Sequence, residues 1–193
     1  MYKMVVTPNP VLLKKADKVT KFDKKLKEII SGMKKTLDAT SDPVGVGLAA
    51  PQVGISKQIF LVKPAEDGPT QVFINPEIIE NKEAEEIPEF ENSKKVEAKK
   101  PKKSKKKLLE GCLSIPNIWG NVARKREAKV IWQDETGEKH EKVFSGFPAI
   151  IIQHEYDHLN GILFTKHVMA QGEQLYRSHK NAEGEDEFEE IEV

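Results

Sequence analysis

The segment 147–159, FPAIIIQHEYDHL, constrains the fold of this chain more than any other, because it combines ionisable side chains with a strongly apolar run. Ser145 and Pro148 suit the start of a helix and Asn160-Gly161 suits its end, so we predict a helix over 147–159. The run Ile150-Ile151-Ile152 predicts that this helix is deeply buried. The rest of the chain must then enclose it.

Two histidines of this helix indicate a metal site. His154 and His158 are four residues apart, which puts both imidazoles on one helix face about one turn apart. Glu155 lies about 100° round the helix, where a carboxylate can reach a metal-bound water as a general base. An isolated pair of histidines at this spacing is a coincidence about as often as it is a metal site. Buried imidazoles beside a buried carboxylate are costly unless they are paired or coordinated, so we predict metal binding.

An open catalytic metal site needs a third protein ligand, and Cys112 is the best candidate. A lone cysteine is more often a small buried apolar residue, but this one follows a carboxylate and a flexible residue, Glu110-Gly111. His140, His167 and His179 are rival ligands, each in a highly charged stretch without a partner at metal spacing, so we expect them to be solvated. A single cysteine also fits a reducing compartment.

The remaining pattern favours one α+β domain. Apolar residues at helical spacing predict an N-terminal amphipathic helix over 22–37. Two hairpins are expected, one from strands 58–63 and 71–76 and one from strands 128–133 and 139–144. We therefore expect antiparallel or mixed strands packed around the central metal-binding helix.

Two segments have an unusual charge. Residues 81–107 are strongly charged, and nine of the fourteen residues 94–107 are lysine, which predicts a mobile insertion within a catalytic domain of residues 1–166. For 167–180 we expect a short helix, and for the acidic end of the chain a disordered tail. Lys plus Arg equals Asp plus Glu at 31 each, so the overall charge favours neither a membrane nor specific DNA as a partner. Without an apolar run of about 20 residues or a signal peptide, we expect a soluble, cytoplasmic protein.

Three segments in this order resemble the motifs of the peptide deformylases, which remove the N-formyl group from the initiator methionine of new polypeptides. They are GVGLAAPQVG at 45–54, EGCLSIPN at 110–117 and QHEYDHLNG at 153–161. The resemblance extends to about residue 166, with 81–107 as an insertion outside it. It implies a hydrolase in which Cys112, His154 and His158 hold one divalent ion, usually Fe²⁺, which Zn²⁺, Ni²⁺ or Co²⁺ often replaces.

The same resemblance implies the roles of neighbouring residues. Glu155 would be the general acid and base, and Gln52 with the backbone N–H of Leu113 would stabilise the oxyanion. An extended substrate would pair with backbone near Gly47 and Gly111, beside an apolar slot for methionine. The candidate substrate-binding set is Val46, Gly47, Leu108, Glu110, Gly111, Phe147, Ile150 and Ile151.

The chain departs from the family pattern at two places. Ile118-Trp119-Gly120 stands where members often carry an arginine that contacts the substrate backbone, and Arg124 and Arg126 follow only later. The segment after Leu163-Phe164 also lacks the expected acidic residue.

Other functions compete with this interpretation. An endoprotease of the His-Glu-x-x-His class would share two ligands and the base, but it commonly takes its third ligand from histidine or glutamate, so Cys112 argues against it. An inactive homologue could bind ribosomal RNA through lysines of 94–107, although no catalytic residue is missing. A phosphate-binding loop is not indicated, since the glycine-rich run matches neither nucleotide motif. The resemblance implies a bacterial protein, although organelles also contain enzymes of this family.

Overall fold

A computed structural model describes residues 1–41, 44–65, 68–79, 108–181 and 186–191. The predicted insertion at 81–107 therefore lies outside the described residues. The first strand after it begins at Leu108. In the described part, no helix is long and apolar enough to cross a membrane.

A five-stranded antiparallel sheet forms one wall of the molecule, in the order β1-β2-β3-β6-β7. Its strands are β1 (Gly47–Ala49), β2 (Ile59–Val62), β3 (Gln71–Ile79), β6 (Glu127–Gln133) and β7 (Lys139–Ser145). The predicted hairpins are confirmed as β2–β3 and β6–β7. In β6 buried and half-buried residues alternate, as expected where one sheet face covers a core.

A second antiparallel sheet faces the first, in the order β4-β5-β8-β9. Its strands are β4 (Leu108–Cys112), β5 (Ile115–Val122), β8 (Leu175–Lys180) and β9 (Asp186–Ile191). Helix α3 (Phe164–Ala170) packs on β5, where Phe164 and Val168 are buried.

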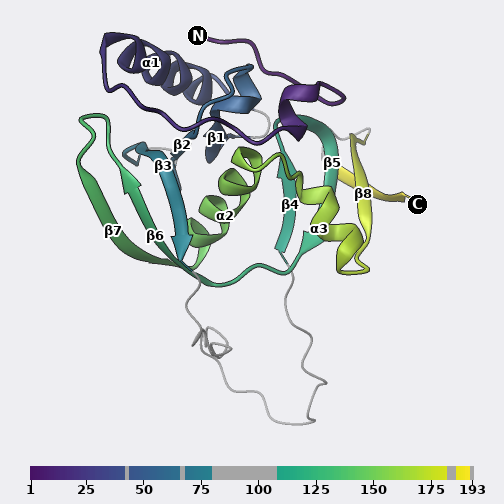
Figure 1. The fold of residues 1–193 in the computed structure, drawn as a ribbon. Helices are drawn as coiled ribbons and strands as arrows, with labels where there is room; N and C mark the ends of the chain where they lie inside the picture. The colour runs from purple at the N-terminus through teal and green to yellow at the C-terminus, as the bar shows by residue number, and fades with distance from the viewer. Residues whose placement is uncertain (42–43, 66–67, 80–107, 182–185, 192–193) are drawn as a thin grey trace.

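Helix α2 (Phe147–Leu159) lies between the two sheets (Figure 1), with the bounds that the sequence predicts. It begins after Gly146, whose φ of 66° favours glycine, and ends at Asn160. Its residues Ile151, Ile152 and Leu159 join Phe60, Phe73 and other side chains of the first sheet in one apolar cluster. The α+β class with antiparallel sheets is confirmed.

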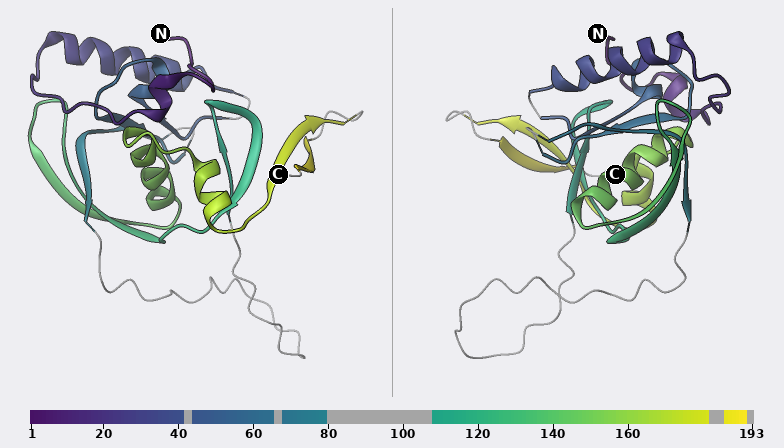
Figure 2. Two further views of the ribbon diagram at one scale, coloured as in Figure 1. Left: turned by 45° about the vertical axis from the view of Figure 1, so that its right-hand side comes forward. Right: turned by 90° about the vertical axis from the view of Figure 1, so that its left-hand side faces the viewer.

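The predicted N-terminal helix is α1 (Lys24–Asp38), which covers the outer side of the first sheet (Figure 2). The Asp23 carboxylate caps it by accepting from the Leu26 backbone N–H at 3.0 Å. Its buried residues pack with Leu48 and Ile59 in a second apolar cluster. The described residues also form two short 3-10 helices, η1 (Pro10–Leu13) and η2 (Ala50–Val53).

The C-terminal part differs from the expectation of a short helix over 167–180 and a disordered tail. Helix α3 ends at Ala170, and β8 and β9 pair from Leu175↔Ile191 to Lys180↔Asp186. The physical reason is that apolar Phe188 and Ile191 lie among the acids of β9. In addition, Arg177 and Lys180 of β8 lie opposite the acidic residues Glu189 and Asp186. The overall acidic composition of the segment does not reveal which residues pair across the hairpin, so it does not predict the two strands.

Candidate metal centre

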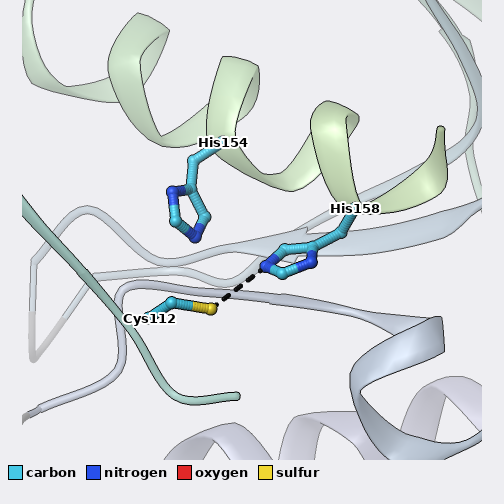
Figure 3. Close-up of side chains that lie close together, drawn as sticks. All are labelled: Cys112, His154 and His158. Atoms are coloured by element: carbon cyan, nitrogen blue, oxygen red, sulfur yellow. Dashed lines mark hydrogen bonds between the residues drawn. The ribbon is translucent and has the colours of Figure 1, made fainter. Parts of the chain in front are cut away.

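Three metal-ligating side chains from two distant segments meet between the sheets. Ligand atoms of Cys112, His154 and His158 all lie within 4.8 Å of one another. Figure 3 shows the two imidazoles projecting from α2 toward the sulfur of Cys112, whose Sγ is 3.2 Å from His158 Nε2. The sequence-predicted trio is therefore brought together.

Local structure explains this convergence. The four-residue spacing on α2 puts the two imidazole rings 5.1 Å apart. On the other side, the pairing of β4 with β5 shifts register between Gly111 and Cys112, at the turn that joins the two strands. A register shift of this kind re-aims a side chain, here the thiol at the end of β4.

The donor set fits a divalent metal ion. One thiolate and two imidazoles are ligands for zinc or for a divalent transition metal, and three protein ligands leave a position for water. Cys112 and His158 are buried, and burial holds the pKa of His158 well below its usual value, which favours the neutral imidazole that a metal requires.

Glu155 is enclosed beside this trio. Its residue is 4% exposed, its Oε2 has no hydrogen-bond partner among the described protein atoms, and burial raises the pKa of its carboxyl to about 7. A Cβ built at Gly47 would lie 2.8 Å from Glu155 Cδ, closer than real Cβ atoms come. Glycine at this position therefore makes the room that the carboxylate occupies.

The side chain of Gln52 in η2 is oriented by a backbone N–H at the start of the same 3-10 helix. Its Oε1 accepts from the Ala49 backbone N–H at 2.8 Å, which fixes the orientation of the amide. Its Nε2 is then directed at Cys112 Sγ, 3.6 Å away, and the residue is only 2% exposed. The amide is thus a buried donor at the edge of the trio.

A chain of hydrogen bonds and ion pairs runs outward from His154. His154 Nδ1 lies 3.1 Å from Glu110 Oε2, and Arg124 donates to both oxygens of Glu110, at 2.7 Å and 3.0 Å. Arg124 also donates to Asp157 Oδ2 at 2.6 Å, and His167 Nε2 lies 2.8 Å from the same oxygen. Such contacts orient a ligating imidazole.

The charge state of Glu110 follows from this chain. Burial disfavours its ionised form, but the hydrogen bonds from His154 and Arg124 outweigh burial and lower the pKa of Glu110 to about 2. Glu110 is therefore an anion that accepts a hydrogen bond from His154 Nδ1. The other ring nitrogen of His154, Nε2, is then left for the metal site that it forms with Cys112 and His158.

The profile of the family described as Polypeptide deformylase matches residues 1–174. The chain belongs to this family. A peptide deformylase of Thermotoga neapolitana is 43% identical over 163 residues, which cover 84% of each chain. The peptide deformylase of Christiangramia forsetii is 37% identical over 185 residues, covering 88% of this chain and 83% of the relative.

Solved deformylase structures share the fold. The crystal structure of the Thermotoga maritima peptide deformylase aligns with a TM-score of 0.67 at 37% identity, covering 86% of this chain and 97% of the other. A plant peptide deformylase aligns with a TM-score of 0.70 at 34% identity, covering 88% and 82%. Peptide deformylases are metal-dependent hydrolases that act on formylated nascent peptides, so this family member is a metal-dependent enzyme.

The remaining candidate residues lie in different surroundings. Val46 is half-buried, Leu113 is half-buried beside Gly45, and Leu108 is the first residue of β4. Along α2, Phe147 is 45% exposed and Ile150 is half-buried. Ile151 instead belongs to the apolar cluster against the first sheet. For any single apolar residue of a helix, core packing is expected about as often as a place in the methionine slot, and Ile151 has the core packing.

Sequence reasoning missed the contacts that Glu110, Arg124 and Asp157 make here. Glu110 was expected at the substrate, but its carboxylate is fully engaged with His154 and Arg124. Arg124, noted only as a late arginine, has a side chain 6% exposed. Asp157 follows His154 by three residues, and that helical spacing is the one signal that could have indicated it.

The other three histidines do not belong to the group formed by Cys112, His154 and His158. His167 contacts Asp157, and His179 lies 3.7 Å from Glu187 on the neighbouring strand. His140 groups with Asp134 and Glu138 within metal-binding distance. However, the Asp134 carboxylate already accepts from Thr136 and the Glu138 backbone in the β6–β7 turn, so the group is explained as turn structure.

Proposed function

We propose that this enzyme hydrolyses the N-formyl group of formyl-methionyl peptides, with Cys112, His154 and His158 as the ligands of its metal ion. The observation that carries the proposal is the convergence of these three side chains beside the buried carboxylate of Glu155. The alternative of an endoprotease is disfavoured by the thiol, because such enzymes commonly use histidine or glutamate as the third ligand.

A divalent ion in this site would supply a water molecule that loses a proton near neutral pH. Glu155 would accept a proton from the water molecule that attacks the formyl carbon, and would return that proton to the departing amine as the C–N bond breaks. Formate and a free amino terminus are released. A carboxyl whose pKa is raised to about 7 suits a group that must accept and return a proton.

The developing oxyanion would receive hydrogen bonds from Gln52 Nε2 and the backbone N–H of Leu113. The contact from Ala49 to Gln52 Oε1 supports this role, since it keeps the amide N–H₂ directed toward Cys112. A donor that is fixed before the reaction is typically worth about 3 kcal/mol of transition-state stabilisation.

The substrate would bind as an extended strand. Among the described residues, β1 and β4 are each the terminal strand of their sheet, so each has a backbone edge that no described strand pairs with. We propose that Val46, Gly47 and Gly111 pair with the peptide backbone, and that Leu108, Phe147 and Ile150 contribute to the methionine slot.

Assay of the purified enzyme with formyl-Met-Ala-Ala tests the reaction. We expect stoichiometric formate release and no cleavage of unformylated casein, because the proposed specificity depends on the formyl group and casein has none. Cleavage of casein without formate release would establish the protease instead.

The native metal is proposed to be Fe²⁺, with Zn²⁺, Ni²⁺ or Co²⁺ able to replace it. Thiolate ligation of iron predicts that activity decays in air and that the metal lost is iron. Metal analysis of enzyme purified with and without oxygen measures this. An air-stable enzyme containing zinc under both conditions would contradict the assignment.

The lysine-rich segment 94–107 is proposed to contact the ribosome in the cytoplasm of a bacterial cell. Clustered lysines bind phosphates with a strong salt dependence. Deletion of 94–107 should therefore reduce ribosome co-sedimentation at low salt and change it little at high salt. Equal co-sedimentation of both proteins would end this proposal.

A further inference from the structure

The β8–β9 hairpin follows the part of the chain that matches the family, which ends at residue 174. It is therefore a feature of this chain whose role the family match does not explain. β8 pairs with β5 at Ile118↔Arg177, Trp119↔Tyr176 and Gly120↔Leu175. The hairpin thus extends the sheet that begins with β4 and Cys112.

Trp119 links this hairpin to β4. On one side Trp119 pairs with Gly111, and a Cβ built at Gly111 would lie 2.7 Å from Trp119 Cε3 and Cζ3. On the other side Trp119 Nε1 donates to Ser178 Oγ at 3.0 Å, and the Phe188 ring packs edge-on at 5.9 Å between centroids. The indole is therefore held by β8 and β9 with its six-membered ring over Gly111.

The direction of the neighbouring side chains fixes which face of the sheet this is. Glu110 contacts His154, and Cys112 contacts His158, so both point toward α2. Successive side chains of a strand point to opposite faces, and the missing side chain of Gly111 would point at Trp119. The indole consequently lies on the face of β4 that is turned away from α2.

A peptide bound along the free edge of β4 would alternate in the same way. If its methionine side chain points toward α2, the side chain of the next residue points away from α2, on the face of Gly111 and Trp119. Because Gly111 has no side chain, the indole of Trp119 covers this position of β4 on that face. Phe188 and Tyr176 continue it, while Glu190 lies opposite Tyr176.

We propose that Trp119, held by the β8–β9 hairpin, is a specificity-determining residue that favours an apolar side chain immediately after formyl-methionine. This inference rests on the proposed deformylation and on strand-like binding at β4. It adds a contact for the second residue of the substrate.

The test compares formyl-Met-Leu-Ala with formyl-Met-Ala-Ala on the full-length, metal-loaded enzyme. We expect the wild type to prefer leucine by about five- to tenfold in kcat/KM, the scale of a few apolar carbons in a partly open site. Trp119→Ala should lower that ratio to within about twofold of unity, chiefly through KM. A ratio unchanged in Trp119→Ala would overturn the inference.

Two milder variants keep the test decisive if Trp119→Ala folds poorly. Trp119→Phe keeps an aromatic face and should retain much of the preference. Phe188→Ala removes the ring that packs edge-on against the indole and should lower the ratio about twofold. A preference lost equally in Trp119→Phe and Trp119→Ala would contradict a contact through the ring face.

Binding of the product peptide Met-Leu-Ala supplies a readout independent of turnover. The chain has two tryptophans, so the wild type minus Trp119→Phe isolates the emission of Trp119. Met-Leu-Ala should shift that emission to the blue more than Met-Ala-Ala at equal saturation, and identical responses would refute the contact. Absence of formate release from either peptide would instead refute the proposed function, and with it this inference.

Discussion

Replacing Glu155 with glutamine is expected to lower kcat by about 10²- to 10⁴-fold while the protein keeps its metal ion. Glutamine has nearly the same shape as glutamate but does not accept and return a proton at neutral pH. The side chain is buried, and burial disfavours its ionised form, so the neutral amide should not lower the melting temperature. Formate release, metal content and thermal melting measured on one preparation check all three expectations.

Gly47→Ala provides a second route to the same defect with Glu155 still present. The added methyl group would collide with the Glu155 carboxyl group, so the carboxylate must move from its position. We expect a large loss of turnover with the metal retained. Loss of the metal in Glu155→Gln, or activity within a few-fold of wild type in both variants, would contradict the role of Glu155 as the base.

Replacing Arg124 with methionine is expected to destabilise the protein by roughly 3–5 kcal/mol, because it removes the cation from the buried carboxylate of Glu110 and the largely buried carboxylate of Asp157. The side chains of Glu110 and Asp157 are only 5% and 16% exposed, and Arg124 contacts both. At about 2–4 °C per kcal/mol for a chain of this size, the melting temperature should fall by on the order of 10 °C. Thermal unfolding measures it.

Arg126→Met is the matched control, since Arg126 is an exposed arginine two residues further along the chain. A change of that kind is usually within about 0.5 kcal/mol. Metal affinity should also weaken about 10- to 100-fold in Arg124→Met, because Glu110 then no longer holds His154 firmly. Equal melting temperatures for the two variants would show that the buried ion pairs contribute little.

The sequence predicted the local elements well where one short pattern decides the structure. α2 begins at Phe147 and ends at Leu159 as expected, and α1 and the hairpins β2–β3 and β6–β7 follow their apolar periodicity. It predicted poorly where pairing partners decide. β5 contains the proline and glycine of IPNIWGNV, and β9 is mostly acidic, so neither has the composition of a typical strand.

By itself, the sequence determined the chemistry available to this protein. Helical spacing puts His154 and His158 on one face, and the single cysteine leaves one thiol to join them. The tertiary structure alone decided how these groups are held. Arg124 meets Glu110 and Asp157 across sequence separations of 14 and 33 residues. Trp119 lies on Gly111 because of the β4–β5 register. Spacing within one helix is set by local geometry, whereas ion pairs between elements and strand register are set only when the elements pack.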